Sequence, residues 1–187
     1  MGAIPKTNIN YKDQDSLDFR SGLQDILTLL VKENSIDKLS SEILLKSVNL
    51  TNSDLGIITF LDNGPEIKFQ YFDPKTVITN STDIEKTMVA DYKFITKWLT
   101  INNSSLTAVN QKNNLGYNIA SSIGCKTLVI SPCIFDSNLI ATLIAGKLAG
   151  DFSREEIKLL EQFAILLTFV ISNINTRNLN TALENRL

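Results

Sequence analysis

Hydrophobic positions recur at helical spacing near both ends of the chain and at strand spacing between them. Apolar residues after Ser16 share one helical face, and a second amphipathic helix opens at Ser35 or Asp37. Between these helices and the last one, short apolar runs bounded by polar turns predict strands. The strands are expected at residues 55–61, 67–72, 106–109, 127–135 and 139–148.

The middle of the chain is less regular. Residues 83–99 have a helical period that a polar cluster at 102–105 ends. Gly116 and Gly124 interrupt the following segment, which we interpret as a loop with a short helix near 117–122. Such a loop is a natural lid over a binding site.

The start of the last helix has the clearest local signal. Ser153 can accept a hydrogen bond from the amide of Glu156, and a glutamate three residues after a serine completes a capping box. The helix continues as a buried stripe and then as a seam narrow enough to pair with a second helix. We expect a homodimer interface made of Leu160, Leu167, Ile171 and Ile174.

Length and composition favour a single domain. A chain of 187 residues with 43% hydrophobic content can bury one full core. We expect a flexible tail or linker at 1–15, the domain at 16–174, and the start of a coiled-coil signalling helix at 175–187. A net charge of -2 argues against nucleic-acid binding. The apolar runs are too short for membrane insertion and no secretory signal is present, so a cytoplasmic location is expected.

The chain contains no histidine. This absence excludes Ser-His-Asp and Cys-His nucleophile systems, and it disfavours haem and the common zinc sites. Cys125 and Cys133 lie too far apart along an extended segment for a disulfide, and we interpret them as buried small hydrophobes. The alternative for either is a redox or ligand-attachment thiol. No catalytic residue and no metal site are predicted.

Alternation along residues 127–135 separates two faces of a strand. Leu128 and Ile130 share one face, and the other face is smaller and more polar. We interpret the polar face as the lining of a cavity, with an ordinary solvated face as the alternative. The expected site takes a small, mostly uncharged ligand under the 112–122 loop and is lined by Tyr92, Trp98, Tyr117, Ser121, Thr127, Val129 and Ser131.

The order of these elements resembles the GAF domain family, the small-molecule sensor and dimerisation module of signalling proteins. The resemblance covers about residues 17–174 and is carried by the segments SDLGII (53–58), IGCKTLVISP (123–132), LIATL (139–143) and DFSREEIKLL (151–160). It implies an α+β fold with an antiparallel sheet of five or six strands. The N- and C-terminal helices would cover one face, and a ligand pocket would lie on the other.

The resemblance also implies a function and excludes some ligands. Residues 63–69 do not reproduce the signature of relatives that bind cyclic nucleotides, and relatives that carry haem or a covalent bilin use a histidine. The main hypothesis is a regulatory domain that passes ligand occupancy through its C-terminal helix to the effector domain of a histidine kinase, cyclase, phosphodiesterase or transcription regulator. The alternatives are a dimerisation module without ligand, and an enzyme resembling GAF-type methionine sulfoxide reductases that uses Cys125 or Cys133.

Overall fold

The computed structural model describes residues 20–21, 24–29, 33, 35–61, 67–75, 78 and 81–184. Its helices are α2 (Ile36–Leu50), α3 (Ser81–Asn102), α4 (Tyr117–Ile123) and α5 (Arg154–Glu184). Its strands are β1 (Leu55–Leu61), β2 (Ile67–Phe72), β3 (Leu106–Val109), β4 (Thr127–Phe135) and β5 (Asn138–Lys147).

The strands form one antiparallel sheet in the order β2-β1-β5-β4-β3. This confirms the predicted α+β class with five strands, and β5 starts one residue earlier than expected. Asp136 and Ser137 both have positive φ, as a two-residue hairpin turn between β4 and β5 requires. The turn predicted after β1 lies outside the described residues.

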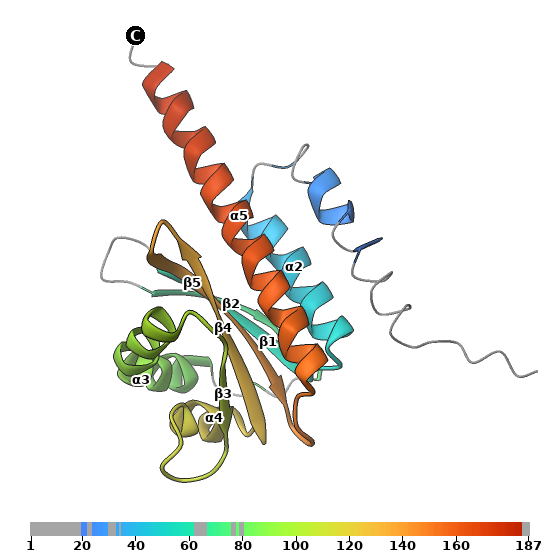
Figure 1. Cartoon of the computed structure of the whole chain (residues 1–187), viewed down its shortest axis with the longest axis vertical. Coiled ribbons are helices and arrows are strands. Elements are labelled where there is room, and N and C mark those ends of the chain that lie inside the picture. The colour runs from blue at the N-terminus through green and yellow to red at the C-terminus, as the bar shows by residue number, and fades with distance from the viewer. Residues whose placement is uncertain are drawn as a thin grey trace, which may run out of the picture.

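Helices cover both faces of the sheet (Figure 1). The first helix is described only in part, and its residues 24–29 are helical. α2 and α5 pack on one face, where they share a core with Val129, Leu143 and Ala145. α3 and α4 pack on the opposite face around a second core that includes Leu128, Ile130 and Ile144. The terminal helices therefore share a face, as the resemblance implies.

The predicted starts of α2 and α5 are confirmed, whereas the start predicted at Ser16 lies outside the described residues. Ser35 caps α2 by accepting a hydrogen bond from the amide of Lys38. At α5, the Ser153 hydroxyl accepts from the Glu156 amide at 3.1 Å, and the Glu156 carboxylate accepts from the Ser153 amide at 2.7 Å. These bonds satisfy donors that a helix start leaves without partners.

The last helix is long and leaves the domain. α5 has 31 residues, and its buried side chains end at Ile174, after which the described residues are exposed. Figure 1 shows this end of α5 extending past the sheet. By length and composition the segment Arg154–Ala182 would suffice to cross a membrane, but one face of it is buried against the sheet and α2.

Candidate functional site

The predicted ligand site begins on α3, which presents one apolar face to the sheet. The buried residues of α3 recur at helical spacing and are Ile84, Met88, Tyr92, Ile95 and Leu99. The hydroxyl of Tyr92 lies 2.6 Å from Thr59 Oγ1, which lies 2.6 Å from Thr142 Oγ1. Burial raises the pKa of Tyr92, so its hydroxyl stays protonated and joins α3 to β1 and β5.

Apolar side chains fill the space between α3, α4 and the sheet. The sheet contributes Leu55, Ile57 and Ile144, and α4 contributes Ile119 and Ile123. All five are at most 4% exposed. Trp98 is half-buried at the margin of this cluster, which agrees with the simpler interpretation of Trp98 as a core residue.

Thr127, Val129 and Ser131 lie on the opposite face of the sheet, so the seven predicted site residues do not enclose one cavity. The hydroxyl of Thr127 donates to the carbonyl of Gly150, and Val129 packs in the core beneath α5. Ser131 Oγ lies 2.8 Å from Ser105 Oγ. The physical reason for this correction is that α5 packs closely on this face of the sheet. The side chains there are therefore small, and the hydroxyls of Thr127 and Ser131 are hydrogen-bonded within the protein.

Tyr117 and Ser121 do come together, at the outer side of α4. They line a shallow hollow of about 600 Å³ between α3 and α4, together with Lys86, Thr87, Ala90, Asp91, Asn118 and Ser122. The Asn118 amide donates to both carboxylate oxygens of Asp91, at 3.0 and 3.2 Å, and so joins the two helices. A neighbouring hollow of about 540 Å³ lies along the predicted lid, at residues 112–118. Hydroxyl, amide and carboxylate groups here suit a small polar molecule.

A third hollow, of about 720 Å³, lies beside the edge strand β2 and was not predicted. Its lining includes Phe60, Lys68, Gln70, Ile140 and Ile171. Gln70 is held there because its amide donates to the carbonyl of Asp37 and to the hydroxyl of Ser41. The sequence signal was present, since the alternation in residues 67–72 marks a half-buried strand.

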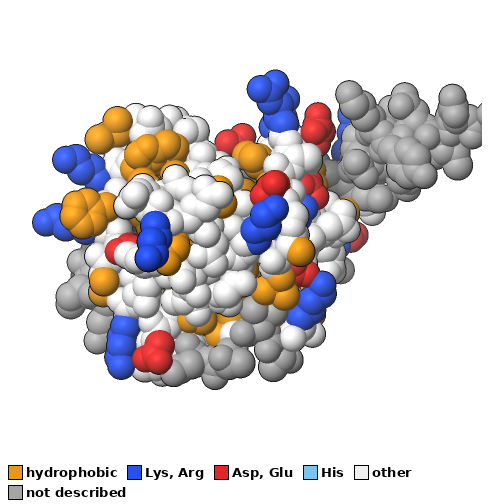
Figure 2. Space-filling view, turned by 90° about the horizontal axis from the view of Figure 1, so that it is seen from below, with side chains coloured by type: hydrophobic (Ala, Val, Ile, Leu, Met, Phe, Trp, Pro, Cys, Tyr) orange, Lys and Arg blue, Asp and Glu red, His pale blue; other side chains and the backbone are white. Residues whose placement is uncertain are grey.

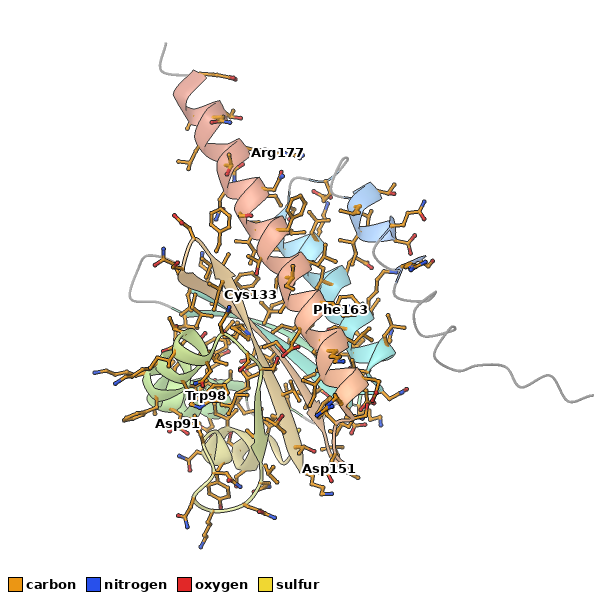
Figure 3. All side chains as sticks on the ribbon, in the orientation of Figure 1. Asp91, Trp98, Cys133, Asp151, Phe163 and Arg177 are labelled. Atoms are coloured by element: carbon orange, nitrogen blue, oxygen red, sulfur yellow. The ribbon has the colours of Figure 1, made fainter. Side chains whose placement is uncertain are left out.

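The two thiols are buried on different faces of the sheet. Cys125 belongs to the core under α3 and α4. Cys133, which is labelled in Figure 3, belongs to the core under α5. Burial raises the pKa of each thiol from 9.0 to about 12. Both are therefore protonated at neutral pH and are poor nucleophiles. Within the described residues, no cluster of three acidic or cysteine ligands could hold a metal ion.

No family model and no curated protein sequence matches this chain. Solved structures do match it. One is the GAF domain of a protein assigned as a sensor histidine kinase from Pseudomonas syringae pv. tomato, with a TM-score of 0.61, 13% identity and coverage of 96% of this chain and all of that one. The chain has the fold of GAF domains.

Two further GAF-fold matches have similar statistics. A domain of a protein assigned as a two-component sensor histidine kinase from Sinorhizobium meliloti 1021 has a TM-score of 0.60 and 13% identity, and covers 80% of this chain and 99% of that one. A phycoerythrobilin-bound GAF domain from a cyanobacterial phytochrome has a TM-score of 0.60 and 11% identity, with coverages of 87% and 99%.

The predicted dimer seam of this GAF fold is buried within its own domain. Leu160, Leu167, Ile171 and Ile174 are at most 5% exposed and pack against α2 and the sheet. They cannot contact a second chain while the domain stays folded, which corrects the interface prediction. A different row of α5 is exposed, with Ile165 at 69%, Phe169 at 47% and Leu179 at 65%.

A polar cluster joins the start of α5 to the GAF sheet. Lys147 Nζ lies 2.7 Å from Glu156 Oε1 and 4.7 Å from the ring centre of Phe152. Nearby, the Asp54 carboxylate accepts from the Leu148 amide and pairs with Lys75. Burial alone would raise the pKa of Asp54, but these hydrogen bonds and the lysine charges outweigh it and lower that pKa. The cluster stabilises the position of the α5 start.

Proposed function

We propose that this chain is a cytoplasmic regulatory sensor domain of a larger signalling protein, working as a homodimer with α5 as its output. The observation that carries the proposal is that α5 has two structural roles. One face of the helix is part of the domain core, while an exposed face continues past the domain to Glu184. A shift of the sheet is thereby transmitted directly to the exposed face. The sensor kinases whose domains share this fold support the same role.

The exposed row of α5 has the spacing of a coiled-coil seam. Positions 165, 169, 172, 176 and 179 alternate steps of four and three residues, as paired helices require. Ile165, Phe169 and Leu179 supply apolar contacts, while Ser172 and Thr176 separate them. Because polar residues inside a seam reduce its stability, we expect the dimer to be reversible.

For the ligand, we propose a small, mostly uncharged molecule in the hollow between α3 and α4, contacting Tyr117 and Ser121. The contact between Asp91 and Asn118 lies at this hollow, and Tyr92 follows Asp91 in α3. The hydroxyl chain from Tyr92 reaches Thr59 and Thr142 in the two strands at the sheet centre. A ligand that separates α3 from α4 would therefore strain the sheet beneath α5.

The second candidate is a dimerisation module without a ligand. It is favoured by the filled interior between the sheet and α3 and α4. A thermal-shift screen of metabolites separates the two functions, because a ligand at a hundred times its dissociation constant stabilises the fold by about 2.7 kcal/mol. A true hit should bind more weakly to Asn118→Ala. A screen without hits would leave the dimerisation module as the function.

Sedimentation of seam variants tests the dimer. Ile165→Glu combined with Phe169→Glu should convert the dimer into a folded monomer, because the added charges would be buried in the pair but exposed in the monomer. Ile101→Glu, at an equally exposed isoleucine of α3, is the matched control and should stay dimeric. A wild-type chain that sediments as a monomer at micromolar concentration would contradict the proposed homodimer.

A further inference from the structure

The outer face of α3 carries apolar and basic side chains that no described part of the chain covers. Phe94 and Ile101 are 68% and 71% exposed, and Val89 is 52% exposed. Phe94, the half-buried Trp98 and Ile101 follow at steps of four and three residues, so they form one row along the helix. Water-exposed apolar rows of this kind mark contact surfaces.

Lysines run beside this row. Lys86, Lys93 and Lys97 lie seven and four residues apart, so their ammonium groups project from the same side of α3. Among the described residues, Lys86 has one ion contact, at 3.8 Å to the exposed Asp83. In the part of the chain that the structure describes, the ammonium groups of Lys93 and Lys97 form no ion pair or hydrogen bond.

Asp83 is the acidic residue of α3 that lies beside these lysines, whereas Glu85 and Asp91 bond to neighbouring elements. Glu85 accepts a hydrogen bond from the Tyr71 hydroxyl, and Asp91 is bonded to the Asn118 amide. On this face three lysines stand against Asp83, so it has a local excess of positive charge although the whole chain has a net charge of -2. Its charge complements an anionic surface.

The face is convex and stands at the edge of the molecule. α3 has 22 residues, which gives a length of about 33 Å. Figure 1 shows it on the side of the sheet away from α2 and α5, and Figure 2 shows lysine and hydrophobic side chains gathered at that side. Contact at this face therefore leaves the exposed row of α5 free.

We propose that the outer face of α3 binds the surface of a membrane that contains anionic lipid. Lysine is depleted from the contact surfaces of protein–protein interfaces. Helices that lie on membranes instead combine lysines with Trp, Phe and aliphatic residues, and a lipid surface adapts to a convex helix. The lysine stems can lie along the lipid boundary while their ammonium groups contact phosphates. Phe94 and Ile101 enter the boundary between headgroups and acyl chains.

Vesicle sedimentation with the full chain tests the proposal. The probes are vesicles of phosphatidylcholine alone and of phosphatidylcholine with phosphatidylserine. The chain should sediment with the second kind only, and added salt should release it. Lys93→Gln with Lys97→Gln should bind about thirtyfold more weakly, which corresponds to ~1 kcal/mol for each lysine near an anionic surface. Phe94→Ser with Ile101→Ser should also lose binding.

Matched controls distinguish binding through this face from nonspecific adsorption to the vesicles. Lys158→Gln removes an exposed lysine of α5, and Phe135→Ser removes an exposed aromatic side chain at the end of β4. Both should bind like wild type, and circular dichroism should show every variant folded. The proposal would be overturned if the wild-type chain sedimented with neither kind of vesicle, or if the α3 variants bound as tightly as wild type. Binding to soluble polyglutamate but not to vesicles would assign the face to an acidic protein instead.

Discussion

Lys147 is a charged residue that the fold buries, with only 9% of its surface exposed. Its ammonium group lies between the Glu156 carboxylate and the ring of Phe152. Such a charge is tolerated only when it is paired, because burial removes its hydration. The same carboxylate also caps α5 through the Ser153 amide. Glu156 therefore has two structural roles at the start of α5.

Glu156→Gln should lower the free energy of unfolding by about 1–3 kcal/mol, because it leaves Lys147 without its counter-charge while an amide oxygen can still serve as the cap. Urea unfolding measures the change. Glu155→Gln is the matched control: it removes an exposed neighbouring carboxylate and should cost less than about 0.5 kcal/mol. Equal losses in both variants would show that the pair with Lys147 adds nothing.

At the scale of elements, α2 approaches β1 closely because Gly56 has no side chain. A Cβ at this position would lie 2.5 Å from Val48 Cγ2 and 2.6 Å from Leu44 Cδ1. Here the glycine provides space for a helix rather than an unusual backbone angle. The contact fixes how deeply α2 lies on the sheet.

Gly56→Ala should destabilise the domain by about 1–3 kcal/mol, because the added methyl group overpacks the contact between α2 and β1. Thermal or urea unfolding would measure the loss. Ala141→Gly, in the neighbouring strand β5, is a useful comparison, since it weakens a strand without adding volume. A Gly56→Ala variant as stable as wild type would mean that α2 can move outward freely.

The secondary structure could be predicted well from the sequence, but which helix covers which face of the sheet could not. Strand bounds and both caps depend on local spacing, which the sequence contains. Which helix covers which face depends on contacts between distant segments. The face with Val129 has small side chains because α5 packs on it, yet the same pattern also fits a cavity lining. Similarly, Leu167 and Ile165 lie on opposite faces of α5, and only packing shows which of these apolar faces is buried.

At the scale of the whole molecule, the three layers place the two thiols in separate cores. The pKa of each thiol is about 12 when folded and 9.0 when exposed. Between these pH values the unfolded chain releases thiol protons that the folded chain retains. Raising the pH through this window therefore favours unfolding.

We expect the free energy of unfolding to fall above pH ~9, by up to about 1.4 kcal/mol per pH unit for each thiol. Replacing both cysteines by alanine should cost about 1–3 kcal/mol near neutral pH through lost packing, and should make the alkaline fall shallower. Urea unfolding across this pH range, with a reductant present, compares the two slopes. Parallel slopes would show that the thiols do not determine the alkaline sensitivity.

The continuity of α5 has a geometric consequence for whatever follows Glu184. An α-helix is a screw that turns about 100° and advances 1.5 Å with each residue. The domain core fixes the starting angle of this screw, and residues that prolong the helix inherit it. One inserted residue would turn a following domain by about 100°, whereas seven would return it to within about 20° of its original direction. The output that we propose for α5 therefore includes an angular phase as well as a displacement.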